Sequence, residues 1–105
     1  MESVDICVRR AQNGDLNAYS ELVRAYQDMA VAYAHHLLRD VHLAEDAAQE
    51  AFIQVYLHLN DLRQPAAFGA WLRKLVFKYC DRITRRRAMA TTSLDNVPEP
   101  ISQTS

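Results

Sequence analysis

The sequence is poor in the residues that make turns. Its 105 residues include only two glycines and three prolines, and all three prolines lie at or after Pro65. Half of the residues are hydrophobic, so long stretches can keep one regular conformation without interruption. A chain of this length is about one domain. We therefore predict an all-α fold, a small helical bundle of three to four helices.

Other scarcities limit the class of protein. No apolar run approaches the ~18 residues of a membrane span, and the N-terminus, MESVDICVRR, carries acids where a signal peptide has positive charge. We expect a cytoplasmic protein without membrane insertion. Cys7 and Cys80 lie far apart and form no CxxC motif, so we expect reduced, partly buried thiols and no disulfide.

Charge is present in both signs but is divided along the chain. Residues 1–62 contain four arginines and ten acids, whereas residues 63–87 contain eight basic residues and a single acid, Asp81. This division indicates one basic and one acidic partner, although the net charge is only −1. Residues 88–105 have no apolar periodicity, and we expect a flexible linker or tail there.

Apolar residues at spacings of three and four predict the helices. Three are predicted in this way, over residues 4–12, 16–38 and 41–59. Asp15 and Asp40 are the N-cap candidates for the second and third. Pro65 suits the first turn of a last helix, which we expect to end at about Arg87. The folded domain should therefore comprise residues 1–87.

The stretch AEDAAQEAFIQVY, residues 44–56, has two faces when it is drawn as a helix. The face that should be buried includes Ala48, Phe52, Val55 and Tyr56. The other face combines polar and branched apolar residues, namely Asp46, Gln49, Glu50, Ile53 and Leu57. Such a mixture is typical of a docking surface. The alternative is that Ile53 and Leu57 pack beneath a neighbouring helix and the acids only solubilise the protein.

The last predicted helix has a basic stripe beside its apolar face. Lys74, Lys78 and Arg85 form the stripe, and Trp71 and Arg82 lie between the stripe and the core. Cations neutralise phosphates and aromatic faces stack on unpaired bases, so this pattern favours nucleic-acid binding. The alternative is a solvated helix surface whose cations complement the helix macrodipole.

The acids and histidines do not form a catalytic or metal-binding pattern. The pair His42-x-x-Glu45 occurs once, whereas di-iron bundles place such pairs on two helices. Asp46 and Glu50 belong to the outward face instead. We therefore expect no catalytic residue, no metal site and no cofactor. We also expect that the protein is not an enzyme.

Four segments together resemble a known family. They are Asn13-Gly14-Asp15, AEDAAQEAF, LNDLRQPAAFGAWLRKLV and RITRRR. They resemble region 2 of the bacterial RNA polymerase sigma factors, specifically the extracytoplasmic-function (ECF) group. The resemblance covers residues 8–87, and its motifs are specific as a set although each is weak alone.

The resemblance implies two partners. The helix matching residues 43–59 would dock on the clamp helices, a coiled coil of the beta-prime subunit of core RNA polymerase. Asp46, Gln49 and Glu50 stand at the matching contact positions, with Ile53 beside them. An anti-sigma factor is a further candidate partner.

The same resemblance implies recognition of the minus-ten promoter element as the melted non-template strand. The loop over residues 60–66 would receive a base turned out of the stack, with Asn60, Arg63 and Gln64 as candidates for its hydrogen bonds. The helix after the loop would hold the strand. Its candidate DNA-binding residues are Trp71, Lys74, Lys78, Arg82 and Arg85.

The chain departs from the family in three ways. Lys78 stands where the family usually has Asn, and Arg82 where it has an acid, so the promoter preference does not follow from the resemblance. We expect the region 4 domain, which reads the minus-thirty-five element, to be absent from this chain. SLDNVPEPISQTS resembles the linker to that domain, which fits either a piece cut at the linker or a natural protein without the second part. The alternative function is a polymerase-binding regulator that does not itself read DNA, and the basic stripe argues against it.

Overall fold

The computed structural model describes the backbone of residues 3–95 and the side chains of residues 3–90. Within this range the chain is helical and contains no strand, which confirms the predicted all-α bundle. The elements are α1 (Val4–Gln12), α2 (Leu16–Leu38), α3 (Val41–His58), the 3-10 turns η1 (Leu59–Asp61) and η2 (Pro65–Ala67), and α4 (Phe68–Asp95).

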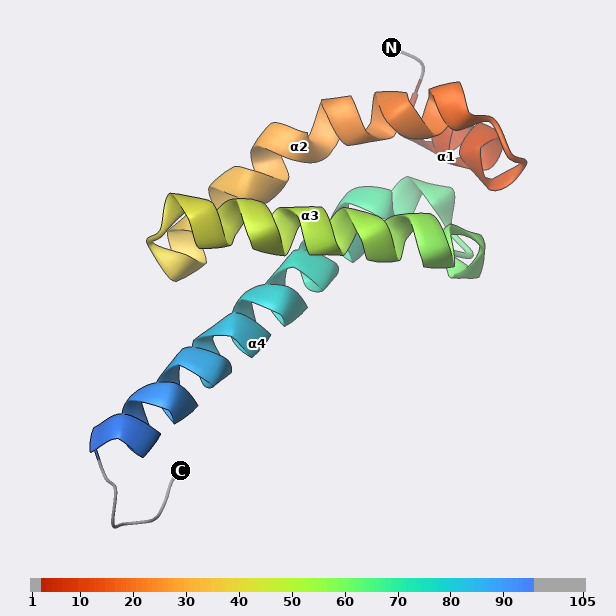
Figure 1. Cartoon of the computed structure of the whole chain (residues 1–105). Coiled ribbons are helices and arrows are strands. Elements are labelled where there is room, and N and C mark those ends of the chain that lie inside the picture. The colour runs from red at the N-terminus through yellow and green to blue at the C-terminus, as the bar shows by residue number, and fades with distance from the viewer. Residues whose placement is uncertain (1–2, 96–105) are drawn as a thin grey trace.

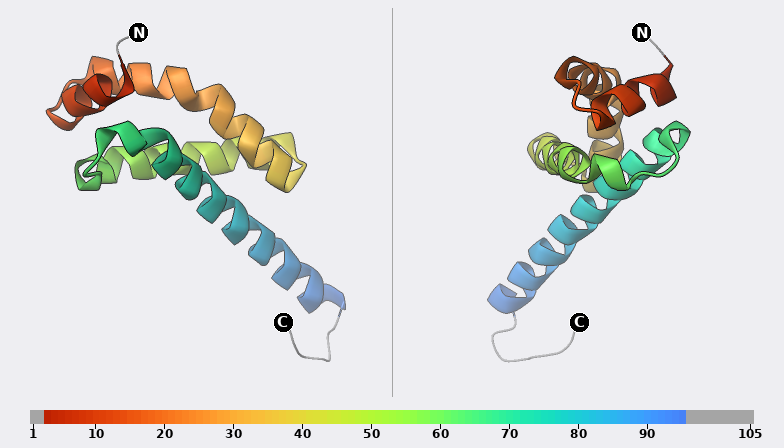
Figure 2. Two further views of the ribbon diagram at one scale, coloured as in Figure 1. Left: turned by 180° about the vertical axis from the view of Figure 1, so that it is seen from behind. Right: turned by 90° about the vertical axis from the view of Figure 1, so that its right-hand side faces the viewer.

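The helices α2 and α3 lie side by side and run antiparallel, and α4 crosses them and projects beyond them (Figure 1). Figure 2 shows the same arrangement from behind and from the side. The short helix α1 packs at the end of the molecule where α3 stops, and it contacts α2 and both 3-10 turns. The loop between α3 and α4 therefore lies against α1.

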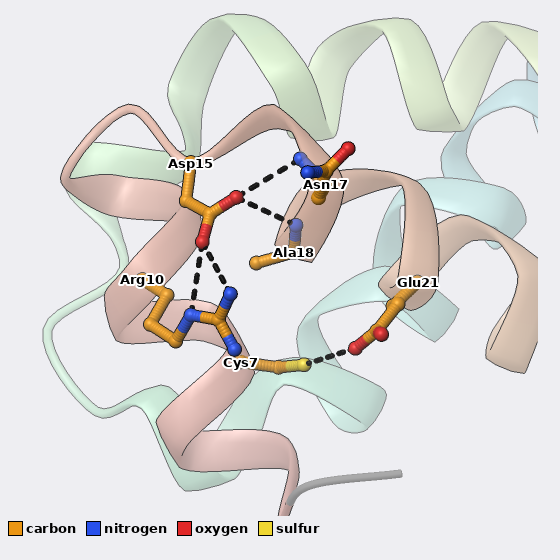
Figure 3. A network of polar contacts seen from close by, with 6 residues as sticks. All are labelled: Cys7, Arg10, Asp15, Asn17, Ala18 and Glu21. Atoms are coloured by element: carbon orange, nitrogen blue, oxygen red, sulfur yellow. Dashed lines mark hydrogen bonds and ion pairs between the residues drawn. The ribbon is translucent and has the colours of Figure 1, made fainter.

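Asp15 fixes the corner between α1 and α2. Its Oδ1 accepts hydrogen bonds from the amides of Asn17, at 3.0 Å, and Ala18, at 3.2 Å, so the predicted N-cap is confirmed. Its Oδ2 accepts from Nε of Arg10 at 2.9 Å (Figure 3). The Arg10 side chain, followed by the Ala18 amide, lowers the pKa of Asp15 below its usual value. A single carboxylate thus caps α2 and ties it to α1.

The turn between α2 and α3 is equally defined. Arg39 ends α2 in the left-handed region, with φ 57° and ψ 29°, and its amide donates to the His35 carbonyl at 2.8 Å. Asp40 then caps α3 by accepting from the Leu43 amide at 3.0 Å, as predicted. The two helices can reverse direction within two residues because one of the two takes a positive φ.

The predicted ends of the last two helices are corrected. The helix α3 ends at His58, and Leu59 begins a 3-10 turn. The helix α4 begins at Phe68 and continues to Asp95, so the expected end at about Arg87 was eight residues too early. Ala88, Met89 and Ala90 are strong helix formers, which explains the continuation. The rest of the expected tail, residues 96–105, lies outside the described residues.

The core is apolar and is filled from all four helices. Its largest fully buried side chains include Phe68, Leu22 and Leu72, and no polar side chain is buried among the described residues. The ring of Phe68 meets Tyr26 edge to face, with centroids 5.1 Å apart. Neither Cys7 nor Cys80 forms a disulfide, and both side chains are fully buried, not partly buried as predicted. From Thr84 to Ala90 every side chain of α4 is exposed, so this part of the helix lies outside the core.

Candidate functional site

The outward face of α3 is exposed along its length. Asp46, Gln49 and Glu50 are exposed, and so are Ile53 at 47% and Leu57 at 62%. The alternative in which Ile53 and Leu57 pack beneath a neighbouring helix is therefore wrong. We call these five residues the α3 outer face. Two branched apolar side chains in water beside three polar ones are typical of a binding surface.

Tyr56 does not belong to the buried face of α3, contrary to the prediction. It is 57% exposed, and its ring meets Tyr19 edge to face with centroids 5.2 Å apart. At about 100° per residue Tyr56 falls roughly a quarter turn from the centre of the buried face, which places it at the edge of the α2–α3 contact. The Tyr19 hydroxyl donates to the Phe52 carbonyl at 2.9 Å, so this edge is held by an aromatic pair and a hydrogen bond.

A groove of about 640 Å³ separates the α3 outer face from α4. Asp46, Gln49 and Glu50 line it from α3. The residues that line it from α4 are Tyr79, Arg82, Ile83, Arg86 and Arg87. Neither Asp46 nor Glu50 forms an ion pair with another described side chain. Both carboxylates are therefore available to a partner, although cations stand across the groove.

A second groove, of about 430 Å³, lies on the opposite side of α3, between α3 and α2. It is lined by Val23, Gln27 and Val31 from α2. Asp46 and Gln49 line this groove as well as the first. These two side chains therefore stand on a ridge with a groove on each side.

The basic stripe of α4 is exposed, as predicted, and is organised around a ring that the sequence did not single out. Lys74, Lys78 and Arg82 are all exposed. Nζ of Lys78 lies 5.8 Å from the centroid of the Tyr79 ring, and Cζ of Arg82 lies 4.9 Å from it. Tyr79 is a core residue, 7% exposed, that also holds two cations on the surface. The i, i+3 spacing between Tyr79 and Arg82 is the feature of the sequence from which this contact could have been predicted.

The remaining members of the stripe differ in their surroundings. Arg85 pairs with Asp81, with Nε 3.1 Å from Oδ2, but both side chains are largely in water, so the pair is weak. Trp71 is half-buried and meets Phe68 edge to face at 6.2 Å between centroids. Its position between stripe and core is as predicted. Phe77 is 51% exposed on the same helix.

The loop between α3 and α4 carries Asn60 in η1, with Arg63 and Gln64 following it, and all three side chains are exposed. Asn60 also borders a third groove, of about 330 Å³, beside Tyr19 and Tyr56. The structure thus brings the three loop candidates together. It also places them at the end of the molecule away from the projecting part of α4 (Figure 1).

Gln12 contacts this loop, and sequence reasoning missed it. Its Nε2 donates to the carbonyls of Leu59, at 2.9 Å, and Leu62, at 3.0 Å. The partners lie 47 and 50 residues away along the chain, so no local sequence pattern predicts the contact.

Within the part of the chain that the structure describes, no three histidine, cysteine or acidic side chains are grouped so that they could hold a metal ion. None of the described helices is both long and apolar enough to cross a membrane.

Comparison with known proteins defines the class. Residues 22–89, from within α2 to the exposed part of α4, match the sigma-70 region 2 family, and the chain belongs to that family. It is 31% identical over 81 residues to the ECF RNA polymerase sigma factor SigW of Bacillus subtilis, which covers 76% of this chain and 43% of that protein.

Two further relatives agree with this family. The ECF RNA polymerase sigma-E factor of Escherichia coli K12 is 33% identical over 70 residues, covering 67% of this chain and 36% of that protein. The probable RNA polymerase sigma factor RfaY of Xanthomonas campestris is 43% identical over 65 residues, covering 62% and 16% respectively. The chain spans less than half the length of each of these relatives. No solved structure matches it.

Proposed function

We propose that this chain is a transcription initiation factor domain. It binds the beta-prime clamp helices of core RNA polymerase through the α3 outer face. It holds the melted non-template strand of the minus-ten promoter element with α4 and the loop before it. The observation that carries the proposal is the pair of exposed, oppositely charged surfaces on a domain of the sigma-70 region 2 family.

The shape and charge of α3 support a coiled-coil partner. Asp46 and Gln49 stand on a ridge between two grooves, so the two helices of a coiled coil can straddle them. The unpaired carboxylates of Asp46 and Glu50 favour a basic partner, and Ile53 adds apolar area beside them. Hot-spot residues of an interface lie at its well-packed centre, and polar contacts surround them.

The surface of α4 supports a phosphate backbone as its partner. Lys74, Lys78 and Arg82 follow one side of the helix at spacings of four, which is about one turn. Cations in such a row can meet successive phosphates of one strand. The loop residues Asn60 and Gln64 present amides, which can donate to and accept from a base edge.

The experiment measures binding of the beta-prime clamp fragment to Asp46→Arg and Gln49→Arg variants by calorimetry. Each change puts a cation where the partner is expected to be basic, and each should cost ~2 kcal/mol or more of binding free energy. Asp28→Arg is the matched control, because Asp28 is an exposed acid of α2 that lines none of the three grooves. Circular dichroism should show that all three variants fold. Wild-type affinity in both Asp46→Arg and Gln49→Arg would sink the assignment of this surface.

A mobility shift with single-stranded minus-ten DNA separates the proposal from a regulator that binds polymerase alone. The basic surface predicts a shift that weakens as salt rises. Clamp binding without any shift would favour the regulator.

A further inference from the structure

Gln12, the last residue of α1, bridges two turns of the loop that precedes α4. Its side-chain amide nitrogen donates one hydrogen bond to the Leu59 carbonyl and a second to the Leu62 carbonyl, at 2.9 and 3.0 Å. Asn60 lies between these two acceptors in the chain, and Arg63 directly follows the second. The amide therefore holds the backbone on both sides of Asn60.

The Leu62 carbonyl in particular needs such a donor. Leu59 follows the last residue of α3, where the chain leaves the regular helical hydrogen-bond pattern. The Leu62 amide donates to the Leu59 carbonyl at 3.1 Å and closes the 3-10 turn, but the Leu62 carbonyl has no backbone donor of this kind. Gln12 supplies two hydrogens from one nitrogen, so it satisfies both groups at once.

Apart from apolar packing, few contacts hold the loop. Among the described residues, Gln12 is the only side chain from another helix that hydrogen-bonds to the backbone of residues 59–64. The side chains of Arg63 and Gln64 are exposed, and the His58–Asp61 contact at 3.3 Å lies within the loop itself and in water. The side chain of Leu59 is buried and that of Leu62 packs against the core, whereas the side chain of Asn60 between them is exposed.

We propose that Gln12 is a positioning residue for base selection. It touches no DNA, and it sets the backbone conformation in which Asn60 and Arg63 meet the unstacked base. This inference rests on the proposed function of the loop. It concerns a residue of α1, outside the range that matches the sigma-70 region 2 family.

The chemistry of the contact provides a sharp variant. In Gln12→Glu the side chain keeps its shape, but an ionised carboxylate has no hydrogen to donate and faces two carbonyl oxygens. Gln12→Met removes the donors without adding charge. Arg24→Gln is the matched control, because Arg24 is an exposed residue of α2 that lines none of the three grooves, and its loss lowers the net charge by the same one unit.

Two readouts are needed. Hydrogen exchange of the amides of residues 60–64 reports the loop directly, and we expect it to be faster in Gln12→Glu by about tenfold. Selection from a pool of random 8-nucleotide single strands, bound by core polymerase with each variant, reports base preference. The ratio of best to worst base at the selected position should fall about tenfold, since one well-positioned base contact is worth that much. Average affinity, its salt dependence and clamp binding should stay within about twofold of wild type.

Each outcome decides one step. Unchanged loop exchange in both Gln12→Glu and Gln12→Met would overturn the positioning role. Faster exchange with wild-type base preference would overturn the link to selectivity. If Gln12→Glu does not fold, Gln12→Met carries the same expectation with a smaller effect. A third outcome is that the wild-type protein has no base preference although loop exchange is faster in the variants. This outcome would show that the proposed function of the loop is wrong, and that Gln12 positions the loop without affecting base selection.

Discussion

Asp46 on α3 and Arg82 on α4 line one groove, although the sequence assigned them to surfaces for two different partners. The guanidinium of Arg82 lies over the Tyr79 ring and forms no ion pair with the acids across the groove. Charges that face the same groove lie within reach of each other's field, even in salt. The proposed polymerase surface and the proposed DNA surface therefore share a border.

Arg82→Ala should affect both partners. Removing this cation should weaken single-strand binding, and it should strengthen binding of a basic clamp fragment by about two- to threefold, because the acids lose an opposing charge. Lys74→Ala removes a cation from the same stripe that does not line the groove, so it should weaken only DNA binding. Calorimetric titration of both ligands into both variants makes the comparison. Identical clamp affinities in the two variants would contradict the electrostatic link.

The helix and the loop should respond differently to substitution. Lys74→Ala and Lys78→Ala should weaken binding to every single strand and lower the slope of log affinity against log salt by about 0.7, the value for one phosphate contact. Asn60→Ala and Gln64→Ala should leave that slope unchanged and alter the preference among minus-ten variants. Fluorescence anisotropy at several salt concentrations measures both quantities. Intact selectivity after both loop changes would remove the loop from base recognition.

Arg39→Gly should stabilise the fold. Arg39 ends α2 with φ 57°, a conformation that costs a side-chain-bearing residue more than it costs glycine. We expect a gain of about 1 kcal/mol in the free energy of unfolding, measured by urea denaturation. Arg24→Gly, at an exposed position inside α2, should lose about the same amount through helix propensity. Loss of stability in both variants would show that the left-handed turn carries no strain.

Asp15 should make part of the stability depend on pH. Its pKa is lowered from 3.8 by the Arg10 hydrogen bond and by the Ala18 amide, so the unfolded state takes up the proton more readily than the folded state. The stabilisation is present above pH 3.8 and is lost as pH falls through the lower folded-state pKa. Asp15→Asn should therefore be less stable than wild type at pH 7, and the difference should shrink under acid conditions. Thermal melts of wild type and Asp15→Asn at pH 7 and under acid conditions measure this difference. Asp28→Asn is the control for the loss of one exposed acid.

The sequence predicts where α2 and α3 begin because each start carries a local signal. Asp15 and Asp40 are side chains that cap the helix starting at the next residue, and both cap as predicted. The end of α4 has no such signal, since Ala88 to Ala90 neither break nor cap a helix. Tyr56 was assigned to the wrong face because it lies at the edge of the apolar stripe. The exposure of a residue at such an edge depends on which neighbouring helix covers it, and its spacing in the sequence does not determine this.

The candidate site was predictable only within single helices. The exposure of Ile53 and the stripe around Lys78 follow from positions on one helix, and both are observed. The groove that joins Asp46 to Arg82, and the hydrogen bonds from Gln12 to the loop, join segments far apart in the chain. Such contacts depend on how the helices cross, and the periodicity of a single sequence does not indicate the crossing geometry.

Transcription by core RNA polymerase with this chain, from a template already melted at the minus-ten element, tests the proposed function most directly. Melting a duplex costs about 1.4 kcal/mol for each base-pair step, and a domain with few cations has little to offset several steps. We therefore expect initiation on the pre-melted template and not on the intact duplex. Asp46→Arg and Lys78→Ala should each reduce the transcripts, and Asp28→Arg should not. No transcript from the pre-melted template, together with no binding to the clamp fragment, would contradict the assignment of this chain as an initiation factor domain.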